Sequence, residues 1–170
     1  MRLSIGSELH AGVLLFDMDG TLVSSIAAVE RVWRRWAAAR GLDDDAVLAA
    51  CHGRRLVETV RDFLPPGADH EAEARGLEAA EMKERDGIFA LPGAAALLQA
   101  LPPGRWAIVT SAHRELAEVR LGLAGLPIPE VLIAAGDVTA GKPDPEGFAT
   151  AAARLGAGAA GAIVFEDAPA

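Results

Sequence analysis

Two aspartates, Asp17 and Asp19, stand two positions apart at the end of an apolar stretch, residues 12–16. In an extended backbone, residues i and i+2 point the same way, so the two carboxylates should share one side of the chain. Like charges this close repel each other, which favours a bound cation or a shared proton. A lone Asp-x-Asp indicates only a turn, but the apolar stretch before it and Gly20-Thr21 after it favour a metal-assisted carboxylate site.

The stretch at residues 12–16 lacks polar alternation, which is typical of a strand buried on both faces of a parallel sheet. Further strands are predicted at 106–109, 130–134 and 162–165, alternating with helices at about 93–101, 112–122 and 144–155. Alternating strands and helices indicate right-handed parallel crossovers. The fold class is therefore α/β, with a Rossmann-like, doubly wound parallel sheet. Ligands of such sheets bind at the carboxyl ends of the strands.

Between the first strand and the rest of the sheet, the pattern is helical throughout. We expect four helices and no strand over residues 24–87, with Ser24 or Ser25 as the N-cap of the first. Prolines and glycines separate the helices, which are predicted at about 25–40, 43–51, 54–64 and 69–86. The domain prediction is a discontinuous catalytic core, residues 1–22 and 89–170, with residues 23–88 as an inserted helical cap.

Polar residues follow each of the other predicted strands or precede the next helix. Thr110-Ser111 offers hydroxyls and free backbone N–H groups at a helix start, which suit a phosphate. Lys142 can neutralise phosphate oxygens and an attacking acid. Glu166-Asp167 adds carboxylates for Mg²⁺, which prefers oxygen ligands. Taken singly, these are typical of a helix cap, a solvated loop lysine and a turn. Together at one sheet edge, they predict a phosphoryl-transfer site.

Composition bounds the class of protein. The chain has 170 residues, 51% of them hydrophobic, and a formal net charge of −8. An acidic chain argues against nucleic acid as a partner, because phosphate backbones select basic surfaces. Cys51 is the single cysteine, so a disulfide within the chain is impossible, and a reducing cytoplasm fits. We expect no signal peptide and no membrane span, and a cytoplasmic monomer or weak dimer.

Four motifs together resemble the haloacid dehalogenase superfamily, which includes phosphatases and phosphomutases. They are Asp17-Met18-Asp19-Gly20-Thr21, Thr110-Ser111, Gly141-Lys142-Pro143-Asp144-Pro145 and Val164-Phe165-Glu166-Asp167-Ala168-Pro169. The predicted helical insertion resembles the small cap domain of subfamily I. Within the superfamily, the chain is most similar to bacterial sugar and hexitol phosphatases and glycerol-3-phosphatases. Since members usually continue with a helix and a strand, the chain resembles a form truncated at its C-terminus.

The resemblance implies a role for each motif residue. Asp17 would attack phosphorus and form an aspartyl-phosphate, and Asp19 would act as general acid and base. Mg²⁺ would sit on Asp17, the Asp19 backbone carbonyl and Asp167, with Glu166 bound directly or through water. The residues implied to hold the phosphoryl group are Thr110, Ser111 and Lys142.

In this family the cap reads the leaving group, and the candidates here are His52, Gly53 and Arg54. A surface helix junction is the alternative interpretation of those residues. The function implied is a Mg²⁺-dependent phosphatase of a small sugar or polyol phosphate. A sugar phosphomutase resembling β-phosphoglucomutase remains an alternative, and so does a truncated, non-catalytic fragment that holds Mg²⁺ and phosphate.

Overall fold

In the computed structural model, the described part of the chain, residues 10–168, contains a four-stranded parallel sheet with the order β5-β4-β1-β6. The strands are β1 (Val13–Phe16), β4 (Trp106–Val109), β5 (Leu132–Ile133) and β6 (Ala162–Phe165). Phe16 pairs with Ile108 of β4 and with Phe165 of β6, so these strands end level with one another. The predicted α/β class with a parallel sheet is confirmed.

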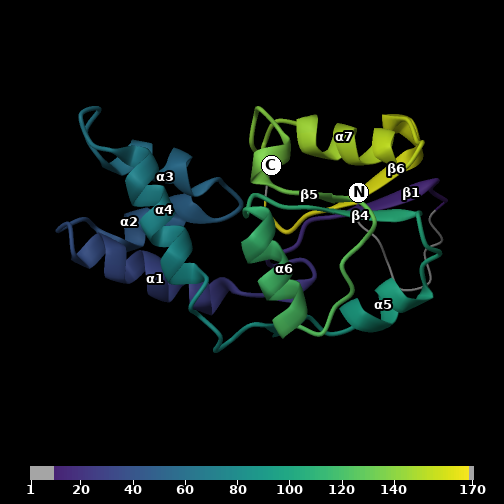
Figure 1. Ribbon diagram of the computed structural model, residues 1–170, viewed down its shortest axis with the longest axis horizontal. Coiled ribbons are helices and arrows are strands. Elements are labelled where there is room, and N and C mark those ends of the chain that lie inside the picture. The colour runs from purple at the N-terminus through teal and green to yellow at the C-terminus, as the bar shows by residue number, and fades with distance from the viewer. Residues whose placement is uncertain (1–9, 169–170) are drawn as a thin grey trace.

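Helices cover both faces of this sheet (Figure 1). On one face lie α5 (Ala94–Ala100) and α6 (Arg114–Leu123), whose Leu98 and Leu121 share a core with Phe16 and Ile108. On the other lies α7 (Glu146–Arg154), where Ala151 packs among Val13, Leu15 and Val109. Successive residues of β1 therefore serve opposite cores, which explains its unbroken apolar sequence. Two 3₁₀ turns, Ala135–Asp137 and Ala159–Gly161, complete the core's helical elements.

A separate helical group lies beside the sheet (Figure 1). It consists of α1 (Ile26–Ala38), α2 (Asp44–Cys51), α3 (Leu56–Phe63) and α4 (His70–Glu81). Trp33 and Trp36 pack edge to face with ring centroids 5.3 Å apart, and they share a core with Val60 and Leu77. The Asp43 side chain accepts from the N–H groups of residues 45 and 46, which caps α2. The group therefore has its own apolar interior.

The expectation that residues 24–87 hold no strand is wrong at one end. Val23–Ser24 forms β2, which pairs antiparallel with β3 (Phe89–Ala90). Two residues are too few to carry a periodic signal, so pattern reasoning missed this ribbon. Helix α4 also ends at Glu81, earlier than predicted, because the chain turns through residues 82–87 to reach Gly87 with φ at +80°.

The last strand has the least cover of the sheet. Strand β6 lies at an edge, and Val164 is 45% exposed. In the described residues, no helix is both long and apolar enough to cross a bilayer. Residues 1–9 and 169–170, including Pro169 of the last motif, lie outside the described part of the chain.

Candidate active site

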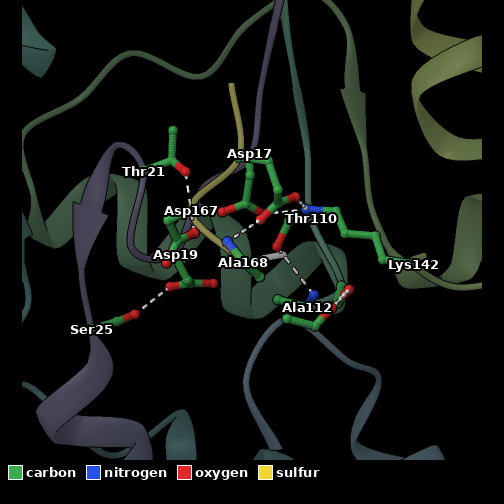
Figure 2. Close-up of polar contacts among 12 residues, drawn as sticks. Asp17, Asp19, Thr21, Ser25, Thr110, Ala112, Lys142, Asp167 and Ala168 are labelled. Carbon is green, nitrogen blue, oxygen red and sulfur yellow. Dashed lines mark hydrogen bonds and ion pairs between the residues drawn. The ribbon is translucent and has the colours of Figure 1, made fainter. Parts of the chain in front are cut away.

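The carboxyl ends of the sheet strands meet at one edge, as predicted, and the motif residues gather there (Figure 2). Asp17 follows β1, Thr110 follows β4, and Glu166 and Asp167 follow β6. A cavity of about 660 Å³ opens over this edge. Its walls come from the sheet edge and from the helical group.

Asp17 lies at the bottom of this site and is only 5% exposed. Burial raises the pKa of its carboxyl from 3.8 to about 7; the neighbouring carboxylates Glu166 and Asp19 also raise it, and Lys142 opposes the shift. The Lys142 ammonium donates to Asp17 and also to Glu166, at 2.7 Å. Lys142 is therefore a buried partner of the acids and not a solvated loop lysine.

Three carboxylates form a potential metal centre. Oxygens of Asp17, Glu166 and Asp167 all lie within 4.8 Å of one another. Because acids outnumber the single ammonium here and all donors are oxygens, the set fits a hard divalent cation such as Mg²⁺. Thr21 Oγ1 donates to Asp167 Oδ1 at 3.3 Å, which helps to orient that carboxylate.

The Asp19 carboxylate points away from the group formed by Asp17, Glu166 and Asp167. Figure 2 shows it turned toward Ser25, while the Asp17 carboxylate is turned toward Lys142. Ser25 Oγ donates to Asp19 Oδ1 at 2.6 Å, and Arg120 Nη1 donates to Asp19 Oδ2 at 2.9 Å. The Asp19 side chain is thus outside the three-carboxylate group.

The two predicted phosphate-binding hydroxyls line the same cavity. Thr110 is buried, and its Oγ1 accepts from the Ala112 N–H at 3.1 Å (Figure 2), so the hydroxyl can still donate its own proton. Ser111 Oγ donates to the Gly53 carbonyl at 2.8 Å. Ser111 therefore joins the sheet edge to the helical group in this structure.

The predicted cap residues also reach the cavity. His52, Gly53 and Arg54 form the loop between α2 and α3, and all three line the cavity opposite the sheet edge. Arg54 Nη1 donates to Asp62 at 2.7 Å, and His52 Nε2 lies 3.8 Å from a carboxylate oxygen of Glu30. His52 and Arg54 thus each have an acidic neighbour within the helical group, and both also line the cavity.

Sequence reasoning missed three polar residues of the site. Ser25 occupies the N-cap position of α1 but makes no capping bond, because its hydroxyl binds Asp19. Arg120 and Glu81 lie within predicted helices, and no sequence motif assigns a function to either of them. Each stands on an apolar helix face, Arg120 four positions after Leu116 and Glu81 four after Leu77. A charge on a buried face was the available signal.

Comparison with known proteins identifies the family of this chain. The haloacid dehalogenase-like hydrolase family matches residues 12–170. Hexitol phosphatase A of Escherichia coli is 46% identical over 160 residues, covering 92% of this chain and 74% of that protein. Validoxylamine A 7′-phosphate phosphatase of Streptomyces hygroscopicus subsp. limoneus is 39% identical, with coverages of 93% and 78%.

Solved structures match the fold as well. A hydrolase from Pseudomonas syringae has a TM-score of 0.78 and 26% identity, and the match covers 91% of this chain and 74% of that one. The match to the family extends from the first strand through all four motifs. The chain therefore belongs to the haloacid dehalogenase-like hydrolases, and within them it is a hydrolase of phosphoric monoesters.

Proposed function

We propose that this protein is a Mg²⁺-dependent phosphatase of a small sugar or polyol phosphate, acting through an aspartyl-phosphate on Asp17. One observation carries the proposal: a buried aspartate, a lysine and two more carboxylates meet beneath a cavity, with a second aspartate held apart from them. This arrangement separates nucleophile from proton carrier. A nucleophile and an acid must both reach one phosphate ester, and the cavity borders both.

In the first step, an oxygen of Asp17 attacks phosphorus and the bond from phosphorus to the ester oxygen breaks. Asp19 gives its proton to the departing alkoxide, which leaves as the alcohol. Lys142 and the Thr110 hydroxyl offset the charge on the phosphoryl oxygens. When bound at Asp17, Glu166 and Asp167, Mg²⁺ supplies positive charge that lets the anionic nucleophile approach the anionic phosphate.

In the second step, water attacks the phosphorus of the aspartyl-phosphate. Asp19, now a carboxylate, takes the proton from that water, and Asp17 leaves as its own carboxylate with inorganic phosphate as product. Asp19 ends the cycle protonated, as it began. One acid thus serves both steps, which is the reason for holding it near the ester and away from Lys142.

The substrate class rests on the cavity and on the relatives. A volume of about 660 Å³ is within the usual range for small-molecule sites. Charged groups in its wall, among them Arg54, can bind hydroxyls of a leaving group. Relatives that are at least 35% identical are named as phosphatases of a hexitol, of validoxylamine A 7′-phosphate and of 2-deoxyglucose 6-phosphate. A polyhydroxylated phosphate ester fits both sets of observations.

The test is release of inorganic phosphate from hexitol, hexose and glycerol phosphates, with Mg²⁺ and with a chelator. We expect release that needs Mg²⁺ and disappears in Asp17→Asn, while Asp45→Asn, on the exposed start of α2, keeps full activity. An isomerised sugar phosphate in place of free phosphate would indicate a phosphomutase. Binding of Mg²⁺ and phosphate without turnover would indicate a non-catalytic protein.

A further inference from the structure

A buried ion pair stands directly behind Asp19. Arg120 of α6 and Glu81, the last residue of α4, are each 4% exposed. Arg120 Nη2 donates to Glu81 Oε2 at 2.8 Å, and its Nη1 donates to Asp19 Oδ2 at 2.9 Å. The three side chains form a chain from Glu81 through Arg120 to Asp19. All three border the cavity.

Stability alone gives a poor account of this pair. Two buried charges lose their hydration, and replacing such a pair by apolar residues of similar volume is often neutral or stabilising. The neighbours on the helix face of Arg120 are apolar, with Leu116 and Ala117 both buried. Arg120 Nε is buried and has no hydrogen-bond partner within residues 10–168. An apolar side chain would suit the packing here, so the contact with Asp19 is the better explanation of the arginine.

The pair fixes the Asp19 side chain from one side while Ser25 fixes it from the other. A guanidinium is planar and rigid, so the bond from Nη2 to Glu81 restricts the directions in which Nη1 can donate. Arg120 then holds Oδ2 and Ser25 holds Oδ1, so rotation of the carboxylate would break one bond or both. The side chain is thereby kept apart from Lys142, which binds the other aspartate (Figure 2).

The supports of Asp19 also come from particular places in the fold. Ser25 immediately precedes α1, and Glu81 ends α4, so both stand where the helical group joins the sheet. Arg120 comes from α6, which packs on the sheet. The position of Asp19 therefore depends on both parts of the molecule.

We propose that Arg120, braced by Glu81, is a positioning residue that holds Asp19 where it exchanges protons with the ester oxygen and with water. This inference rests on the proposed function, since it assigns a support to the proton carrier of that reaction. Arg120 itself transfers no proton, because its guanidinium stays charged throughout. Its effect must therefore fall on the proton-transfer steps and leave the attack by Asp17 intact.

Leaving groups separate these two effects. An alkoxide needs a proton as it departs, whereas p-nitrophenolate departs without one. In a variant with Asp19 misplaced, formation of the aspartyl-phosphate from p-nitrophenyl phosphate should stay fast, and its hydrolysis should become slow. A burst of nitrophenolate then precedes a slow steady state. With a hexitol phosphate, kcat should fall by roughly 10–100-fold, part of what general acid–base catalysis contributes.

The decisive variant is the double substitution Glu81→Leu with Arg120→Met. It removes both charges together, so that no buried charge is left unpaired, and we expect its melting temperature to match that of the wild type. The single variant Arg120→Lys keeps the positive charge but loses the forked guanidinium that binds Glu81 and Asp19 together. It should therefore also lose most of the turnover on the alkyl ester. Arg114→Gln is the control, because Arg114 is on the same helix but pairs with Asp137 at 2.6 Å.

Three results would support the proposal together: a folded double variant, a 10–100-fold lower kcat on the alkyl ester with KM within about threefold, and a nitrophenolate burst that forms as fast as the wild type releases its first nitrophenolate. A crystal structure of that variant should show the Asp19 side chain in another rotamer. Full turnover of the double variant on the alkyl ester would overturn the proposal. A nitrophenolate burst slowed as much as turnover on the alkyl ester would also overturn it. A wild-type protein that releases no phosphate from any ester would instead overturn the proposed function.

Discussion

The carboxylate of Asp167 lies directly against the backbone of Gly20. A Cβ placed on Gly20 would stand 2.2 Å from Asp167 Oδ2, and the glycine has φ at +90°. No side chain fits at that distance, and few adopt that backbone conformation. The Asp167 carboxylate, from the far end of the sequence, thus occupies the space where a side chain at position 20 would stand.

Gly20→Ala should therefore disturb the proposed metal centre. The new methyl group must displace the Asp167 carboxylate, so we expect Mg²⁺ affinity to fall by roughly 10–100-fold, the range seen when supports of a metal ligand are lost. Mg²⁺ dependence of phosphate release, or calorimetric titration with Mg²⁺, measures this change.

Gly41→Ala is the matched control, because Gly41 also has positive φ, at +65°, but open space where its Cβ would stand. Both variants should lose about 1–3 kcal/mol of unfolding free energy from backbone strain. Only Gly20→Ala should change the response to Mg²⁺. Equal Mg²⁺ affinity in the two variants would contradict the prediction.

Stability without metal should depend on pH through Asp17. Its carboxyl has a pKa of about 7 when folded, against an ordinary value of 3.8, chiefly because it is buried. The folded state thus holds this proton more tightly than the unfolded state. Its stabilisation is fully present below about pH 4 and is lost as the pH rises through about 7, at about 1.4 kcal/mol per pKa unit.

The comparison that isolates this effect is Asp17→Asn. In a chelator at pH 8, the variant should be more stable than the wild type in urea unfolding, and at pH 4 the two should agree. Adding Mg²⁺ should raise the wild-type melting temperature and leave that of the variant unchanged, because a bound ligand stabilises the state that binds it. The same pH slope in both proteins would show that other groups dominate.

Arg55 joins the helical group to the sheet edge. It immediately precedes α3, and it donates through Nη1 to the Thr139 carbonyl at 2.9 Å and through Nη2 to the Val138 carbonyl at 2.8 Å. Arg55→Ala should raise KM by roughly tenfold, because the arrangement in which the helical group and the sheet edge together line the cavity becomes less populated, and apparent affinity scales with that population. Steady-state kinetics with a hexitol phosphate measure it.

The control for that variant is Arg61→Ala. Arg61 belongs to the same helix, but within residues 10–168 it pairs only with Glu71 of the helical group, at 2.9 Å and with both side chains exposed. Its loss should leave KM unchanged. A KM that rises equally in both variants would point to a general weakening of α3 and not to the contact with residues 138–139.

The Cys51 thiol should be inert in the folded protein. Burial raises its pKa to about 12, and the residue is 6% exposed. Since the thiolate is the reactive form, labelling by a disulfide reagent at pH 8 should be slow and should accelerate on unfolding in urea. Rapid labelling of the native protein would show that the wall of the cavity opens readily.

The sequence was most informative where a local pattern reports a local cause. Unbroken apolar strands, helical spacing around Trp33 and Trp36, and polar residues after the strands all act over a few positions. Parallel pairing then brings the strand ends together, which is why Asp17 and Lys142 meet although 125 positions separate them. The gathering of the carboxylates at one edge of the sheet followed from these rules.

The missed features depend on contacts that no short pattern contains. Ser25 has the position of a helix cap, and only the tertiary fold shows that Asp19 competes for its hydroxyl. Arg120 and Glu81 belong to different helices, so their pairing depends on how α6 meets the end of α4. The ribbon of β2 and β3 is too short to have a periodicity. Tertiary contacts, and not propensity, determine all three.

That ribbon has a consequence for how such a protein can change. Val23–Ser24 pairs with Phe89–Ala90, so the two ends of the segment 25–88 lie next to each other. An insert whose two ends adjoin can be lengthened, shortened or exchanged with little effect on its host. The helical segment, residues 25–88, is therefore suited to replacement in engineered variants. Segments from other members, spliced at these two strands, should leave the sheet folded, but phosphate release should survive only where the new segment also supplies the supports of Asp19 that Ser25 and Glu81 provide here.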